Sequence, residues 1–153
     1  MSSLFDGLAI SHHFADLPSA FHTAVPPQPL ANSRLLHVNK ELAAQLGLDV
    51  SRLGEQEFLD VVSGQAPLPG GLTVSAVYSG HQFGVWAGQL GDGRAHLLGQ
   101  IDTPTGPQEL QLKGAGKTPY SRMGDGRAVL RSSVREYLAS EAMAGLGIAT
   151  SRA

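Results

Sequence analysis

The chain has 153 residues, a formal net charge of −2 and no cysteine. This length suits one domain or one lobe of a larger protein, and 42% hydrophobic against 16% charged residues exclude a disordered chain and a coiled coil. The lack of cysteine excludes disulfides, zinc–thiolate sites and thiol nucleophiles. The nearly balanced charge favours neither nucleic acid nor an anionic membrane as a partner, and no apolar run reaches the roughly 18 residues of a membrane span.

Residues 1–69 are predicted to form an N-terminal extension of loops and short helices. Asn39 is a suitable N-cap for a helix over Lys40–Leu46, and a second short helix is expected over Glu55–Val62. Each of these helices is followed by a glycine, which is the residue that most easily ends a helix in the left-handed conformation. A short strand is expected over Ser33–Val38.

The character of the chain changes after residue 70, because 13 of its 19 glycines lie between Gly70 and Gly126. Strand-like runs alternate here with turns that suit antiparallel hairpins, one around Leu90–Gly93 and one around Thr103–Pro107. The predicted strands are Phe83–Gln89, Arg94–Asp102 and Gln108–Lys113. In the last of these, apolar and polar residues alternate, so one face of the strand is expected in the core and the other in water.

A long helix is predicted over residues 128–148, because apolar residues recur there at every fourth position. We expect this stripe to face the core. Its members are Leu130, Val134, Leu138, Ala142 and Leu146. Residues Thr150–Ala153 follow the helix without a closing element, so we expect the chain to be the N-terminal part of a longer protein.

Basic residues gather in one stretch of this nearly neutral chain. Between Leu110 and Arg135 there are six basic residues and one acid, Asp125. The basic residues are Lys113, Lys117, Arg122, Arg127, Arg131 and Arg135. Interleaved glycines would let backbone N–H groups approach a ligand, so the stretch suits a polyphosphate. The alternative is a solvated basic face on a helix.

The segment Gly114–Thr118 looks like the end of a P-loop, but we reject that interpretation. The motif needs a glycine where this chain has Gln111, and Pro119 follows where a helix should run. A second layout fits better. A glycine-bearing hairpin followed by a strand that ends in a lysine, here Lys113, is typical of the N-lobe of protein kinases. The alternative is an ordinary glycine-rich turn beside a surface lysine.

In a kinase-like lobe, a glutamate on the next helix pairs with this lysine. Glu136 and Glu141 are the two candidates for that role, and Glu136 lies at the edge of the apolar stripe. The histidines have no partners at metal-ligand spacing, so no metal site is predicted in this chain.

Three segments closely resemble the SelO (YdiU) family: Tyr78–Gly84, Ala87–Arg94 and Leu112–Arg131. The resemblance implies an α+β fold in which residues 70–153 form a nucleotide-binding, protein-kinase-like N-lobe. The family binds ATP in a flipped orientation and transfers AMP, instead of phosphate, to Ser, Thr or Tyr hydroxyls of proteins. The partners implied are therefore ATP and protein substrates, without nucleic acid or membrane, and the implied location is the bacterial cytoplasm.

The resemblance also implies roles for residues at matching positions. Lys113 would contact the phosphates and pair with Glu136. The family's catalytic Asp and its ligands for Mg²⁺ or Mn²⁺ belong to a second lobe that this sequence lacks, so the chain alone is expected to be inactive. The residues expected to line the nucleotide are Gly91, Gly93, Arg94, Lys113, Asp125 and Gly126.

Two other functions stay open on the sequence alone. One is a conventional kinase-like phosphotransferase, which would move the γ-phosphate of ATP. The other is a non-catalytic module of the pseudokinase type, which would bind a nucleotide or a partner without transfer.

Overall fold

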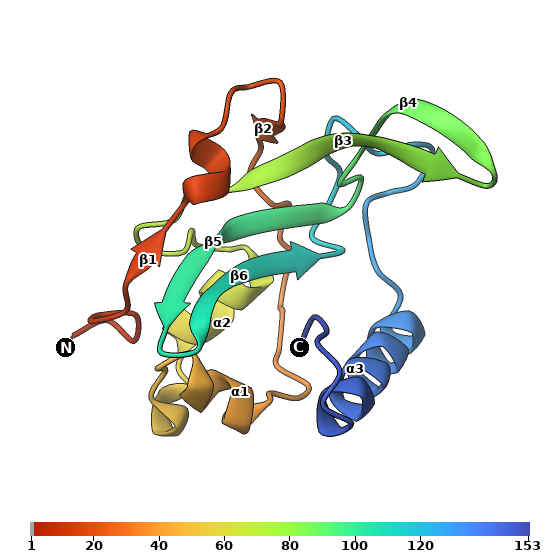
Figure 1. Cartoon of the computed structure of the whole chain (residues 1–153). Coiled ribbons are helices and arrows are strands. Elements are labelled where there is room, and N and C mark those ends of the chain that lie inside the picture. Colours follow the sequence, from red (N-terminus) through yellow and green to blue (C-terminus); the bar gives the residue numbers. More distant parts are fainter. Residues whose placement is uncertain (1) are drawn as a thin grey trace.

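The sheet is built around β5 (Ala95–Thr103), whose residues are buried over most of its length. In the computed structural model, which describes residues 2–153, every strand pair is antiparallel (Figure 1). β5 pairs with β1 (Ile10–Ser11), β3 (Val74–Gln82) and β6 (Gly106–Lys113). The sheet and helices together form the expected α+β fold. The closer likeness to a kinase N-lobe stays a prediction.

The prediction of a hairpin around Leu90–Gly93 is wrong. The strand before it, β4 (Val85–Gly91), pairs with β3 and not with β5. Phe83 and Gly84 join β3 to β4, with φ angles of 54° and 77°. Two consecutive residues with positive φ match the right-handed twist of the strands, so they make the tight turn. The β3–β4 hairpin projects from the sheet at the upper right of Figure 1.

No strand forms over 33–38, where one was expected, and that segment runs as bends and loops. The N-terminal strands that join the sheet are instead β1, at β5, and β2 (His22–Ala24), which pairs with β3. Leu35 and Leu36 are exposed, so this apolar pair finds no face to pack against. The β5–β6 hairpin through residues 103–106 is confirmed.

Both short helices are confirmed, with ends that differ from the prediction by one residue at most. In α1 (Lys40–Gln45), the Asn39 side chain accepts a hydrogen bond from the Leu42 N–H at 3.0 Å. α2 (Gln56–Ser63) ends at Gly64, whose φ of 78° is left-handed. One turn of 3₁₀ helix lies before β2, and another lies between α1 and α2. Their bounds are His13–Asp16 and Val50–Arg52.

The hydrophobic core lies between these helices and one face of the sheet. Its buried side chains come from the first residues of the chain, from α1, α2 and the segment between them, from the link before β3 and from β5. They are Leu4, Phe5, Ala43, Leu48, Leu53, Phe58, Val61, Leu68 and Leu98. Leu110 and Leu112 of β6 pack against them, as their alternation predicted. Residues 2–69 and 70–153 therefore share one sheet and one core, and the domain boundary at residue 70 stays a prediction.

The long helix α3 (Leu130–Gly145) corrects a third expectation, because none of its residues is buried. Its apolar stripe faces solvent, with Leu130 60% and Leu138 61% exposed. The helix stands beside the end of the sheet (Figure 1) and makes polar contacts to it, so no apolar surface covers the stripe within residues 2–153. None of the helices in this part of the chain has the length and apolarity needed to cross a membrane.

Candidate functional site

An ion pair links the end of β6 to α3. Lys113 Nζ donates a hydrogen bond to Glu136 Oε2 at 2.7 Å, and both side chains are about half exposed. The hydrogen bond and the charge of Lys113, with a further contribution from Arg94, hold the pKa of Glu136 below its usual value. Of the two glutamates proposed from the sequence, Glu136 is therefore the partner of Lys113. Glu141 pairs with Arg152 instead, at 2.6 Å.

Arg94 lies beside Lys113 because of the strand register. Ala95, the first residue of β5, pairs with Lys113, and the Gly114 N–H donates to the Arg94 carbonyl at 2.7 Å. The Arg94 side chain is exposed and donates from Nη1 to the Arg127 carbonyl at 3.4 Å. Two exposed cations, Arg94 and Lys113, thus lie at the same corner of the sheet, and one carboxylate, that of Glu136, reaches this corner from α3.

Asp125 and Gly126 sit on a turn next to this corner. The Asp125 side chain accepts a hydrogen bond from the Arg127 N–H at 2.9 Å, so it stabilises its own turn. The Gly116 N–H donates to the Gly126 carbonyl at 3.1 Å, which ties the turn to the segment just after Lys113. Gly126 has a φ of 74°, and a Cβ there would collide with the backbone of Gly116 and Lys117. No helix begins directly after residues 114–118, as a P-loop would require, so the rejection of the P-loop is confirmed.

The other two glycines predicted to line the nucleotide are covered by the chain itself. A Cβ on Gly91 would overlap the Tyr120 ring, and one on Gly93 would lie 3.0 Å from the Tyr120 carbonyl oxygen. Gly91, Tyr120 and Arg122 also line a polar groove of about 250 Å³ beside the β3–β4 hairpin. Sequence reasoning missed Tyr120 because no spacing rule relates residue 120 to residue 91.

The structure therefore brings the predicted residues together in two neighbouring groups. Arg94, Lys113 and Glu136 converge at the end of β6, with Asp125 and Gly126 on the adjoining turn. Gly91 ends β4 and Gly93 lies in the turn between β4 and β5, three residues and one residue before Arg94, respectively. Arg94 joins the two groups.

The residues of this corner do not make a site for a divalent cation. Within residues 2–153 no three His, Asp or Glu side chains cluster as metal ligands would. Glu136 is paired with a lysine, and Asp125 accepts from the backbone. Magnesium needs several oxygen ligands around it, and these two carboxylates do not supply them.

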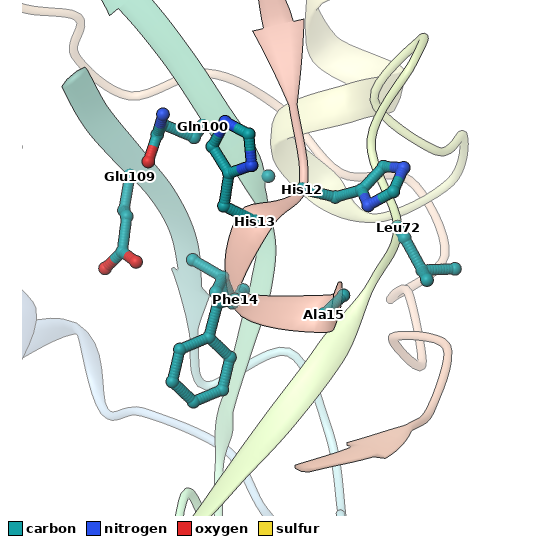
Figure 2. A pocket seen from close by; sticks show the side chains of 9 residues that line it. His12, His13, Phe14, Ala15, Leu72, Gln100 and Glu109 are labelled. Carbon is teal, nitrogen blue, oxygen red and sulfur yellow. The ribbon is translucent and has the colours of Figure 1, made fainter. Parts of the chain in front are cut away.

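A second hollow lies elsewhere in the sheet, between the first 3₁₀ turn and β5. Figure 2 shows His12 and His13 there, pointing to different sides, with Gln100 and Glu109 across from His13. His12 Nδ1 lies 3.1 Å from an Asp16 oxygen. None of the residues predicted to contact a nucleotide lines this hollow.

The comparison with known sequences decides the family. A sequence profile of the family described as "Protein adenylyltransferase SelO" matches residues 5–153. The chain belongs to the SelO family. The resemblance of the three glycine-rich segments is thereby confirmed.

Curated relatives of this SelO-family chain carry the name "Protein nucleotidyltransferase YdiU". The one from Bordetella avium is 69% identical over 153 residues, which is 100% of this chain and 31% of the relative. Those from Bordetella petrii and Herminiimonas arsenicoxydans are 70% and 57% identical, over 95% of this chain and 29% and 30% of the relative. The chain spans about a third of the length of the relatives that it matches.

Proposed function

We propose that this chain is the nucleotide-binding part of a SelO-family protein that transfers AMP from ATP to Ser, Thr or Tyr hydroxyls of other proteins. The observation that carries the proposal is the corner where Arg94 and Lys113 converge and Glu136 holds Lys113. Family membership supports the nucleotide and the group transferred. ATP as the donor and bacterial relatives suit a reaction in the bacterial cytoplasm.

The donor groups of the corner suit phosphate oxygens. An ammonium group has three N–H donors, and the structure assigns one of those of Lys113 to Glu136. The remaining two are free to bind phosphate, while the guanidinium of Arg94 can bind two oxygens side by side. Glu136 thus fixes the position of Lys113 without neutralising the whole corner, because two cations face one carboxylate.

In the proposed reaction, the acceptor hydroxyl oxygen forms a bond to the α-phosphorus of ATP. The bond from that phosphorus to the oxygen bridging to the β-phosphate breaks, pyrophosphate leaves, and the hydroxyl proton passes to a base. A divalent cation would supply charge stabilisation to the phosphates. Lys113 and Arg94 would bind the pyrophosphate part and stabilise its charge as it leaves. The base and the metal ligands are expected in the two thirds of the relatives that this chain does not cover.

The first test measures ATP binding to the chain. Lys113→Ala removes a charged hydrogen-bond donor, so we expect about tenfold weaker binding by equilibrium dialysis with labelled ATP. Lys40→Ala is the matched control, because Lys40 is an exposed lysine on α1, away from the corner. An unchanged affinity in Lys113→Ala, or equal losses in the two variants, would contradict the proposal.

A kinase-like phosphotransferase is the second candidate, because a Lys–Glu pair between a strand and the next helix also occurs in protein kinases. ATP labelled on either the α- or the γ-phosphate separates the two in a full-length family member such as the Bordetella avium relative. Transfer of the α-label to protein supports AMP transfer, and transfer of the γ-label alone supports the kinase. We expect the 153-residue chain by itself to transfer neither label.

A further inference from the structure

The turn Thr118–Ser121, which we call the clamp, holds the connection between β4 and β5. Thr118 Oγ1 donates to the Asp92 carbonyl at 2.7 Å, and Ser121 Oγ donates to the Gly93 carbonyl. Thr118 is buried, with 8% of its surface exposed. Two side-chain hydroxyls of one turn therefore bind two successive carbonyls of the other, which fixes the distance between them.

The Tyr120 ring provides the apolar part of the same contact. It covers Gly91 so closely that a Cβ added there would lie 2.7 Å from Tyr120 Cβ and nearer still to the ring. Neither Gly91 nor Gly93 has a positive φ, so their backbone conformation is open to any residue. The close approach of the clamp, and not the path of the chain, leaves no room for a side chain at Gly91 and only tight room at Gly93.

The clamp is itself anchored. The Tyr120 hydroxyl lies 2.6 Å from Thr23 Oγ1 in β2. Inside the turn, the Thr118 N–H donates to Ser121 Oγ at 2.9 Å and the Tyr120 N–H to Thr118 Oγ1 at 3.1 Å. From the opposite side, the Asp92 N–H donates to the Ala76 carbonyl of β3 at 2.8 Å. The β4–β5 connection is thus held between the clamp and β3.

Arg94 is the residue that follows this connection in the chain. Its carbonyl accepts a hydrogen bond from the N–H of Gly114, the residue next to Lys113. We propose that the clamp positions the Gly91–Arg94 segment, and with it Arg94 beside Lys113, and that Gly91 and Gly93 are glycines because they seat Tyr120 and Ser121. Tyr120 is accordingly a positioning residue. The statement that the arrangement serves ATP binding rests on the proposed function, whereas the statement about packing does not.

The test is a pair of compensating substitutions in the chain. Gly91→Ala places a methyl group against Tyr120, and Tyr120→Gly removes the three atoms that lie nearest to this methyl group. Gly88→Ala is the matched control, since Gly88 lies on the same strand, has no positive φ and has nothing within 4 Å of an added Cβ. Each variant is compared by denaturant unfolding, by hydrogen exchange of the residue 91–95 amides, and by ATP affinity at a temperature where all remain folded.

We expect Gly91→Ala to speed exchange at residues 91–95 and to weaken ATP binding about tenfold, as overpacking displaces the segment. Gly88→Ala should match the unsubstituted chain. The double variant Gly91→Ala with Tyr120→Gly should lose less free energy of unfolding than the two single variants lose when their losses are added. Tyr120→Phe keeps the ring over Gly91 but loses the Thr23 contact, so it should retain most of the ATP affinity.

The outcomes separate the packing from the ligand. Additive effects in the double variant, or equal effects of Gly88→Ala and Gly91→Ala, would overturn the proposal. An ATP affinity unchanged in Gly91→Ala, despite faster exchange at residues 91–95, would overturn the positioning role. If the unsubstituted chain binds no ATP, the proposed function fails for this chain, and the unfolding and exchange data alone decide whether the clamp positions the segment.

Discussion

His96 is a fully buried titratable residue in the middle of the sheet, with none of its surface exposed. Within residues 2–153 neither ring nitrogen has a hydrogen-bond partner, although the Pro26 carbonyl approaches the ring. Burial lowers the pKa of His96 below 6.5, partly opposed by the charge of nearby Asp92. The folded chain therefore holds His96 neutral at neutral pH.

This burial predicts a loss of stability in mild acid. Below pH 6.5 the unfolded chain binds a proton at residue 96 that the folded chain binds only at lower pH, so the free energy of unfolding falls as the pH falls. We expect urea unfolding to show this decline between about pH 7 and pH 5, and His96→Leu to lack it. His13→Gln, at an exposed histidine, is the control. An equal decline in all three proteins would contradict the prediction.

At the scale of residues, the sequence predicts charged partners better than packing partners. The order of strand, lysine and helix left Glu136 and Glu141 as candidates for pairing with Lys113, and the family resemblance implied Glu136. The structure brings Lys113 and Glu136 within 2.7 Å. The contact of Tyr120 with Gly91 joins residues 29 positions apart through two loops. A glycine can mark a left-handed turn or a close approach, and only the folded backbone distinguishes them.

At the scale of elements, α3 illustrates how a regular pattern can mislead. Its apolar stripe has the spacing of a buried helix face, yet Val134, Leu138 and Leu146 are exposed. Periodicity reports that a face is apolar but not what covers it. In the sheet, a weak pattern hid a real element. β3 was not predicted, because its apolar and polar residues alternate only at the start. Without β3, the sequence predicted that β4 pairs with β5, whereas in the structure it pairs with β3.

The exposure of α3 predicts that its stripe contributes little to the stability of this chain. We expect Leu138→Ala to change the free energy of unfolding by less than about 0.5 kcal/mol, as at other exposed sites. Leu98→Ala, at a core leucine that is 4% exposed, should cost about 2–5 kcal/mol. Urea unfolding monitored by circular dichroism compares the two directly. A cost for Leu138→Ala close to that for Leu98→Ala would mean that the stripe is buried in solution.

At the scale of the whole molecule, the first residues are part of the core. Leu4 and Phe5 are about 95% buried, and β1 adds a strand to β5. The sequence indicated a lead-in of loops and short helices here, because a two-residue strand is too short for periodicity to reveal. Long-range pairing, more than local pattern, decides that this segment belongs to the sheet.

Removal of residues 2–11 should therefore unfold the chain. Losing two buried side chains and the β1 pairing costs on the order of 5 kcal/mol or more, comparable with the whole stability of a small domain. We expect the shortened chain to lose its cooperative thermal transition by circular dichroism. Removal of Thr150–Ala153, which follow α3 and are largely exposed, should keep the transition. A cooperative transition in the first variant would contradict the prediction.

The way α3 is attached has a consequence for how the molecule responds to salt. The helix meets the sheet and the segment before α1 through the Lys113–Glu136 pair and a 2.9 Å contact between His37 and the Tyr137 hydroxyl, both exposed. Screening by dissolved ions weakens exposed charge pairs and leaves buried apolar contacts almost untouched. Rising ionic strength should thus weaken the Lys113–Glu136 contact of the helix while the sheet stays folded, and the environment of Lys113 would change without any change in the core.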